Sequence, residues 1–340
     1  MDSQYTYMVC TRCMTFNHHA YIEDAMNGFC MQQTNFPFVC VIVDDASTDG
    51  EQEVIKKYFD THFDLSEKEE TDDYVMAFGQ HKTNNNCYFA VLYLKYNHYS
   101  LNKKSKNPYY ARWYDNSKYI AICEGDDYLI VTDKLQRQVD FLEENEEYSM
   151  VFHGAEIKAE RGASNERFFI ELEDREYSSN EIIQKWIIPT ASMLHRATVI
   201  SKIPKNKYFV FGDDVIYATC LSMGKVFGMS AKMSVYRLVP TGWMATHSGK
   251  QRLYSSISQR KGLMEEFPFY RCNTNYQYMT NTYYNLMCKL LKEKNIKEFR
   301  NIKSDYYNTI PNHSMCRFAL FCIKDITRQI YTKTKSLFRL

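Results

Sequence analysis

The sequence has no apolar run of about 18 residues, the length that a membrane-spanning helix needs. Near the N-terminus a charged residue, Asp2, comes early, and no apolar segment of signal-peptide length follows it. There is no internal repeat. These absences exclude transmembrane and repeat architectures and favour a cytoplasmic protein.

The 11 cysteines lack any regular spacing and are odd in number, and a chain of 340 residues needs no disulfides to complete its core. We therefore expect reduced, mostly buried thiols. Cys10 and Cys13 form a lone CxxC, but no second pair completes a zinc site, and the pair lies on a predicted strand.

Formal net charge is +1, so the average indicates no partner. Residues 245–340, however, contain 17 Lys and Arg against 6 Asp and Glu, which leaves residues 1–244 with a net charge of −10. An acidic first part suits metal binding, and a basic end suits an anionic surface such as phospholipid or a phosphate-bearing substrate. A solvated basic helical face would explain the basic end equally well.

The first half alternates between two kinds of element. Short apolar runs predict strands, and amphipathic spacing predicts helices. The strands are expected at 7–15, 38–43, 88–94 and 118–123, and the helices at 20–32, 51–58 and 134–144. This alternation predicts a parallel sheet covered by helices. Residues 60–87 break the pattern and indicate a long excursion or a flexible loop.

Later signals are weaker until residue 251, after which helical spacing dominates, most clearly at 276–294. Strands are expected at 150–153, 191–195 and 232–237, half of a hairpin at 166–172, and helices at 180–186 and 214–223. We therefore predict a catalytic domain over 1–245, with halves 1–130 and 131–245, and a helical basic extension over 246–340.

Three polar clusters follow predicted strands, at Thr15–Asn17, Asp44–Asp45 and Glu124–Asp127. If the sheet is parallel, all three meet at one edge, where ligands bind in open α/β sheets. Bare carboxylates would repel a nucleotide diphosphate, and a divalent cation resolves that conflict. Mn²⁺ or Mg²⁺ takes one or two protein carboxylates and completes its shell with phosphate and water. A solvated loop or a helix cap is the alternative for such an acidic turn.

Asp45 suggests a different role. Its carboxylate could accept a hydrogen bond from the imide of uracil or from a ribose hydroxyl, or it could cap the helix that begins near Thr48. Because residues 47–49 can provide the cap themselves, we expect Asp45 to be free for a ligand.

The segments 14–18, 43–50 and 119–128 together resemble family two of the glycosyltransferases in order and spacing. Residues 134–143 are also similar to bacterial members that build surface polysaccharides. The resemblance covers roughly residues 5–240 and implies a GT-A fold, a single Rossmann-like domain with a mixed sheet. It also implies a nucleoside-diphosphate sugar donor, often a UDP-sugar.

The same resemblance implies roles for individual residues. Phe16 would lie against the base with Thr15 and Asn17 nearby, and Asp44 and Asp45 would contact the nucleoside. Asp126 and Asp127 would hold the diphosphate and the metal. Glu124, which stands where many members have Asp, ranks below them as a ligand.

A general base is expected in the acceptor half, where Asp213 matches best and Asp214 is its rival. An inverting transferase needs one carboxylate to take the proton of the attacking hydroxyl. The alternative is that both acids cap the helix predicted at 214–223. Two departures from the family pattern concern other positions. Many members have a His shortly after a Tyr-Arg pair, but here none follows Tyr236–Arg237 before His247. The usual Asn-x-Gly before the strand that leads to the acidic turn is also missing, and the region 103–112 takes its place.

Residues 317–340 mix bulky apolar and basic side chains, as would a helix on a membrane surface or a tail packed on the domain. We expect a glycan or lipid-linked saccharide acceptor, no nucleic acid, and a cytoplasmic enzyme peripheral to the inner face of the membrane. Two other functions stay open, a nucleotidyltransferase and a non-catalytic nucleotide-sugar-binding module. The absence of Gly from Met14–His19 counts against the nucleotidyltransferase.

Overall fold

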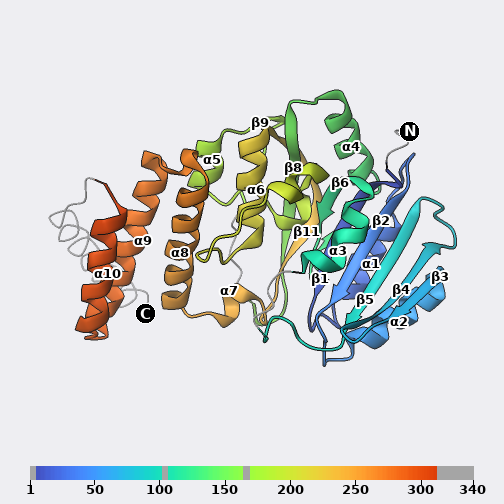
Figure 1. The fold of residues 1–340 in the computed structure, drawn as a ribbon, viewed down its shortest axis with the longest axis horizontal. Coiled ribbons are helices and arrows are strands. Elements are labelled where there is room, and N and C mark those ends of the chain that lie inside the picture. Colours follow the sequence, from blue (N-terminus) through green and yellow to red (C-terminus); the bar gives the residue numbers. More distant parts are fainter. Residues whose placement is uncertain (1–4, 102–105, 164–168, 312–340) are drawn as a thin grey trace, which may run out of the picture. The chain divides into compact units, whose positions relative to one another are not determined.

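The computed structural model describes residues 5–101, 106–163 and 169–311. They belong to two compact units, one formed by 1–203 with 216–245 and the other by 204–215 with 246–340. The first unit contains the sheet and the second is helical (Figure 1). Residues 204–215, expected in the acceptor half, thus group with the second unit.

The centre of the sheet is parallel, in the order β5-β2-β1-β6. These strands are β1 (Tyr7–Thr15), β2 (Phe38–Asp44), β5 (Cys87–Leu94) and β6 (Ser117–Ile122). Every residue of β2 is buried, as its continuous apolar run predicted. All four strands were predicted within one residue at each end.

The rest of the sheet makes it mixed. β10 (Leu194–Arg196) runs antiparallel between β6 and β8 (Tyr148–Ala159), and β11 (Lys225–Leu238) is parallel to β8. Two short strands, β7 (Tyr128–Leu129) and β9 (Arg175–Glu176), pair antiparallel with β11. Residues 169–172 of the expected hairpin form no strand, and 166–168 lie outside the described residues.

Of the two alternatives for residues 60–87, an excursion or a flexible loop, the flexible loop is wrong. Most of this stretch is an antiparallel hairpin of β3 (Phe63–Glu70) and β4 (Tyr74–His81), and β4 pairs with β5 to extend the sheet. Phe63 is the only buried residue of β3. Acidic residues dominate this exposed strand, which lies at the sheet edge, so its sequence lacks the apolar alternation that predicts a strand.

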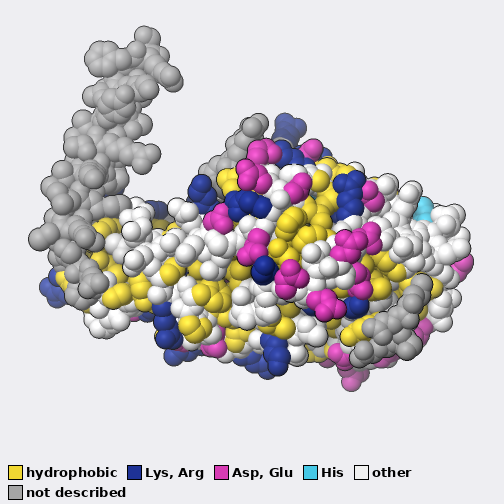
Figure 2. Space-filling view, turned by 90° about the horizontal axis from the view of Figure 1, so that it is seen from above, with side chains coloured by type: hydrophobic (Ala, Val, Ile, Leu, Met, Phe, Trp, Pro, Cys, Tyr) yellow, Lys and Arg dark blue, Asp and Glu magenta, His cyan; other side chains and the backbone are white. Residues whose placement is uncertain are grey.

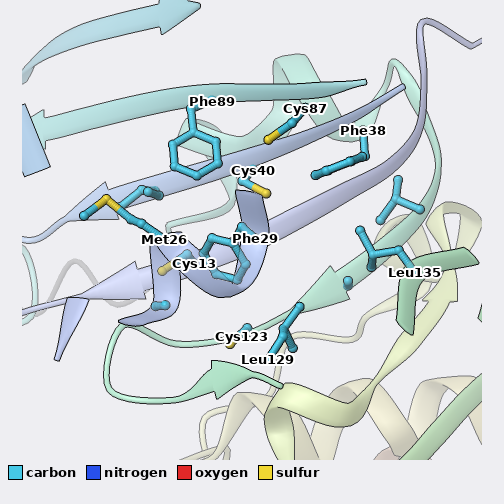
Figure 3. Close-up of a cluster of buried hydrophobic side chains, with 14 of the residues drawn as sticks. Cys13, Met26, Phe29, Phe38, Cys40, Cys87, Phe89, Cys123, Leu129 and Leu135 are labelled. Atoms are coloured by element: carbon cyan, nitrogen blue, oxygen red, sulfur yellow. The ribbon is translucent and has the colours of Figure 1, made fainter. Parts of the chain in front are cut away.

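Helices cover both faces of the sheet. On one face, α1 (Ile22–Cys30), α2 (Glu51–His62) and α4 (Lys134–Glu144) pack against alternate strand residues. Figure 3 shows Met26 and Phe29 of α1 and Leu135 of α4 in this cluster. On the other face lies α3 (Asn107–Tyr114), which was not among the predicted helices. Proline is favourable in the first turn, where its missing N–H has no helical partner. The first unit also contains α5 (Ser179–Gln184) and short 3-10 turns at Thr190–Ser192 and Ala197–Lys202.

Cys10 and Cys13 cannot share a metal or form a disulfide with each other. They are three residues apart on β1, so their side chains point to opposite faces, Cys10 toward α3 and Cys13 toward α1. Burial raises the pKa of both thiols. Figure 3 shows Cys13, Cys40, Cys87 and Cys123 among apolar side chains such as Phe29 and Phe89. The expectation of buried thiols is confirmed for these residues.

The described part of the second unit contains α8 (Gly249–Glu266), α9 (Asn273–Lys292) and α10 (Ile296–Thr309), with a 3-10 turn at Pro268–Tyr270. α6 (Gly212–Met223) and α7 (Trp243–Thr246) each continue from one unit into the other. The core of the second unit is rich in aromatic residues, including Tyr283, Tyr284 and Tyr306. Within the described ranges, no helix is long and apolar enough to cross a membrane.

Charged side chains of both signs are interspersed with apolar ones over the face seen in Figure 2. The amphipathic segment expected at 317–340 lies outside the described residues.

Candidate functional site

The carboxyl ends of β1, β2 and β6 lie side by side at one edge of the sheet. Thr15 is aligned with Asp44 across the β1–β2 pair, and the Asp45 N–H donates to the Thr15 carbonyl at 3.0 Å. On the other side of β1, the Gly125 N–H donates to the Met14 carbonyl, also at 3.0 Å. The three polar clusters therefore meet where neighbouring parallel strands end, which confirms the predicted convergence.

Gly125 allows the acidic turn to approach β1 closely. A Cβ at this position would collide with Thr15 Oγ1 and would lie 3.1 Å from His18 Nδ1. No other residue type fits there without moving one of the two loops. The Gly between the acids of the turn is thus a packing requirement.

Glu51, the first residue of α2, ties two of the loops together, although no sequence pattern indicated it. Its fully buried carboxylate accepts hydrogen bonds from the Thr15 hydroxyl, from the His18 N–H at 2.8 Å and from the Ser47 hydroxyl at 2.8 Å. Burial raises the pKa of Glu51, and these hydrogen bonds oppose the rise.

Asn17 joins the same two loops through its side chain and its backbone. It has a left-handed φ of 57°, its N–H donates to Ser47 Oγ at 2.8 Å, and its Oδ1 accepts the Thr48 N–H at 2.8 Å. The neighbouring Phe16 ring is 41% exposed at the sheet edge. The loop therefore presents an open aromatic side chain on a rigid backbone, which suits stacking on a planar ligand.

Asp45 is not free for a ligand, contrary to the expectation. It is 4% exposed, and its carboxylate accepts bonds from Lys106 Nζ at 2.8 Å, the His98 N–H at 2.8 Å and the Tyr99 N–H at 3.1 Å. Asp49 does accept the Glu51 N–H near the start of α2, as expected. These hydrogen bonds hold the segment that follows β5 in place, so the Asp45 carboxylate is already engaged within the protein.

Asp44 is buried beside Asp45 and accepts hydrogen bonds from the Gln52 side chain at 2.5 Å and the Ser47 N–H at 3.2 Å. Burial raises the pKa of Asp44. Both partners of its carboxylate lie in the loop and helix that follow β2, so Asp44 stabilises the conformation of that loop.

Arg237 on β11 holds the acidic turn in place. Its side chain is 1% exposed, and its guanidinium donates to the Asp126 carbonyl at 2.9 Å, to Glu160 at 3.1 Å and to Asp24. The guanidinium also lies 4.3 Å from the centre of the Tyr128 ring. Its partners Asp24, on α1, and Glu160, just after β8, lie far from it in the sequence, so no local pattern predicted this role.

The two aspartates of the turn have different environments. Asp127 is 3% exposed, its Oδ1 accepts the Arg237 backbone N–H at 2.8 Å, and burial together with the nearby charge of Asp126 raises its pKa well above the ordinary value. Asp126 has a side chain that is 20% exposed, and its Oδ2 lies 3.9 Å from His18 Nε2. Glu124 is exposed.

The donor atoms fit a hard divalent cation that brings most of its own ligands. In the described ranges, no three His, Cys, Asp or Glu side chains are close enough together to hold a metal. Asp126 still offers a partly exposed carboxylate at the point where the three loops meet. Such a half-filled oxygen site is typical of Mn²⁺ or Mg²⁺ bound through substrate phosphates and water.

Asp213 and Asp214 lie in the first turn of α6, in the second unit. A helix N-terminus favours carboxylates electrostatically, so the helix-capping alternative remains compatible with their position. The segment before them is fixed by Gln259 of α8, which is 1% exposed. Its Oε1 accepts the N–H groups of Val210 at 2.7 Å and Phe211 at 3.0 Å, and its Nε2 donates to the Phe211 carbonyl.

A cavity of about 620 Å³ borders the loop that follows β2. It lies among α2, β3, β4 and the end of β5, so the hairpin supplies one of its walls. Its lining combines the Tyr93 ring with Lys56, Lys68 and Lys95. None of the predicted site residues lines it.

No family model matches the chain. It is 25% identical over 245 residues to uncharacterised proteins of Mycobacterium tuberculosis and Mycobacterium bovis, an alignment that covers 72% of this chain and 62% of theirs. The chain therefore spans less than two thirds of the length of these curated relatives.

Among solved structures, the chain resembles the mannosyltransferase PcManGT from Pyrobaculum calidifontis, solved in complex with GDP-Man and Mn²⁺. The TM-score is 0.50 at 11% identity, over 98% of this chain and 84% of that one. S. aureus TarS 1–349 in complex with UDP gives a TM-score of 0.48 at 14% identity, over 82% and 69%. The predicted fold class, a GT-A type mixed sheet flanked by helices with a helical C-terminal extension, is confirmed.

Proposed function

We propose that the chain is a glycosyltransferase that uses a nucleoside-diphosphate sugar and a divalent metal. The convergence of Thr15–Asn17, the loop after β2 and the acidic turn at one sheet edge is the observation that supports this most. It brings an exposed ring, a rigid backbone and a partly exposed carboxylate together. The three match the base, the sugar-phosphate backbone and the metal-bound diphosphate of such a donor.

The donor is a UDP-sugar in this proposal, with family two as the parent group and a hexose as the transferred sugar. Phe16 stacks on the base, and Asn17 and Asp44 keep the loops in position. Asp45 contacts the nucleoside only if its ion pair with Lys106 breaks or if Lys106 also contacts the nucleoside. Asp126 binds the metal, and the buried Asp127 and the exposed Glu124 add negative charge next to it. When bound, the metal stabilises the charge that develops on the departing diphosphate.

The transfer is a direct displacement with inversion. The acceptor oxygen forms a bond to the anomeric carbon while the bond from that carbon to the diphosphate oxygen breaks. Asp213 or Asp214 takes the hydroxyl proton, and the nucleoside diphosphate leaves. Gln259 supports this step by fixing the backbone just before both acids.

The acceptor is a glycan or lipid-linked saccharide of a surface polysaccharide, used at the inner face of the membrane from the cytoplasm. Besides the composition of 317–340, a group of exposed cations in the second unit supports contact with an anionic membrane surface. Lys294, Lys297 and Arg300 are exposed around Ile296, which is 46% exposed, and none of the three makes an ion pair within the described chain. Cations beside exposed apolar residues favour anionic bilayers.

The test is release of nucleoside diphosphate from a panel of UDP-sugars and GDP-mannose, with Mn²⁺ or with EDTA, with and without saccharide acceptors. We expect turnover with at least one donor, dependent on metal. Asp126→Ala and Asp127→Ala should each lower it by about 100-fold or more, because each removes charge that positions the leaving group. Asp72→Ala, an exposed acid in the hairpin turn, is the matched control and should retain full activity.

Two outcomes would contradict the proposal. If no nucleotide sugar is bound or cleaved with metal present, the chain is not a nucleotide-sugar enzyme. If donors bind tightly but no acceptor or water ever accepts the sugar, a non-catalytic binding module replaces it.

A further inference from the structure

His18 and Asp126 face each other across the centre of the candidate site, although they come from different strand ends. The distance from His18 Nε2 to Asp126 Oδ2 is 3.9 Å, and their side chains are 18% and 20% exposed. This separation is too long for a hydrogen bond. The Asp126 carboxylate also accepts no hydrogen bond from any other described residue, so both groups are available to a ligand.

The hydrogen bonds behind His18 decide which ring nitrogen carries the proton. His18 Nδ1 lies 3.2 Å from Thr15 Oγ1, and the Thr15 hydroxyl donates its only hydrogen to Glu51. Thr15 can therefore only accept from the ring, so Nδ1 is the protonated nitrogen of a neutral imidazole. The lone pair is then on Nε2, the atom that faces Asp126.

The ring is also held in this orientation. The His18 N–H donates to Glu51 at 2.8 Å, which fixes the backbone. Gly125 lies beside the same ring nitrogen, where even a Cβ would approach Nδ1 to 3.1 Å. A metal-binding imidazole is typically positioned in this way, with its second nitrogen donating to a fixed acceptor.

We propose that His18 Nε2 and Asp126 together bind the divalent cation of the donor complex, and that His18 gives the site a preference for Mn²⁺ over Mg²⁺. This inference rests on the proposed function. Two ligands that each lie ~2.1 Å from one ion are roughly 3–4 Å apart, which matches the observed separation. The chain then supplies two ligands, and phosphate oxygens and water supply the others.

The preference follows from ligand chemistry. Mg²⁺ selects oxygen ligands, whereas an imidazole nitrogen suits a first-row transition metal. The family pattern would place a His after Tyr236–Arg237, and this chain has none there. His18 would provide the nitrogen instead, from the loop that follows β1.

The experiment is pulsed electron paramagnetic resonance of Mn²⁺ bound to the full chain with UDP, which involves no turnover. We expect nitrogen coupling from a directly bound imidazole, which changes when the protein is labelled with ¹⁵N-histidine. His18→Gln should abolish the coupling and lower Mn²⁺ affinity by about 10-fold or more, since even indirect partners of metal ligands have effects of 10–100-fold. Mg²⁺ affinity should change much less.

His19→Gln is the matched control, because His19 is exposed and contacts Asp49 only through its backbone N–H. It should leave the coupling and both affinities unchanged. If wild-type Mn²⁺–UDP binds without nitrogen coupling, His18 is not a ligand, while the proposed function survives. An ion pair between protonated His18 and Asp126 would then explain their proximity. If neither Mn²⁺ nor UDP binds, both proposals fail.

Discussion

Replacing Arg237 by Met should destabilise the first unit and release the acidic turn. Met keeps much of the side-chain length, so the change removes the guanidinium and little packing. Three directional bonds are lost, to the Asp126 carbonyl, Glu160 and Asp24, together with the contact on the Tyr128 ring.

The loss of unfolding free energy depends on whether water can replace Arg237 at each of its former partners. The Asp126 carbonyl loses its bond inside the protein, which costs about 1–3 kcal/mol. The side chains of Glu160 and Asp24 are 24% and 52% exposed, so water replaces much of what they lose. Loss of the ring contact adds about 1 kcal/mol. We expect a total of roughly 2–4 kcal/mol, which corresponds to a fall in melting temperature of roughly 5–15 °C for a unit of this size.

Thermal unfolding of wild type and Arg237→Met measures this directly. Arg112→Met is the matched control, because Arg112 pairs with Glu67 through two bonds of 2.7 Å but has a side chain that is 53% exposed. An exposed pair contributes about 0–1 kcal/mol, so the control should lose little. Equal shifts in the two variants would refute the claim that Arg237 organises the turn.

Three further predictions concern single positions. Gly125→Ala should weaken Mn²⁺–UDP binding, because the new Cβ forces the turn away from Thr15; unchanged affinity in a titration would contradict this. Burial raises the pKa of Asp127, so its ionisation costs stability as the pH rises from about 4 toward that raised value. Asp127→Asn should therefore unfold at a higher temperature than wild type at pH 7 but not at pH 3.5, and equal gains at both would disprove it. Gln259→Leu removes the side-chain oxygen that accepts two backbone N–H groups and should cost about 2–5 kcal/mol in urea unfolding, whereas Gln277→Leu on the exposed face of α9 should be neutral.

The parallel centre of the fold was predictable because its signals are local. The run Phe38–Val43 is apolar at every position, so it predicts a strand buried on both faces, and all of it is buried. The acidic strand Phe63–Glu70 gave no such signal, since an exposed edge strand needs no apolar alternation. α3 was missed for a related reason, because Pro108 permits both a loop and a helix start.

The site was predictable in its residue types but less so in its internal bonds. The meeting of Thr15, Asp44 and Gly125 at one edge follows from parallel strand order alone. The pairing of Asp45 with Lys106 and of Arg237 with Asp24 depends on residues 61 and 213 positions apart. No local pattern encodes such contacts, so the engagement of Asp45 and the importance of Arg237 became visible only in three dimensions.

The most direct measurement is a crystal structure with UDP and Mn²⁺, in which anomalous scattering locates the metal. The account predicts a manganese peak within bonding distance of Asp126, and the uracil ring against Phe16 at the carboxyl ends of β1 and β2. Nucleotide bound instead in the cavity beside α2, or manganese away from the acidic turn, would contradict the proposed site.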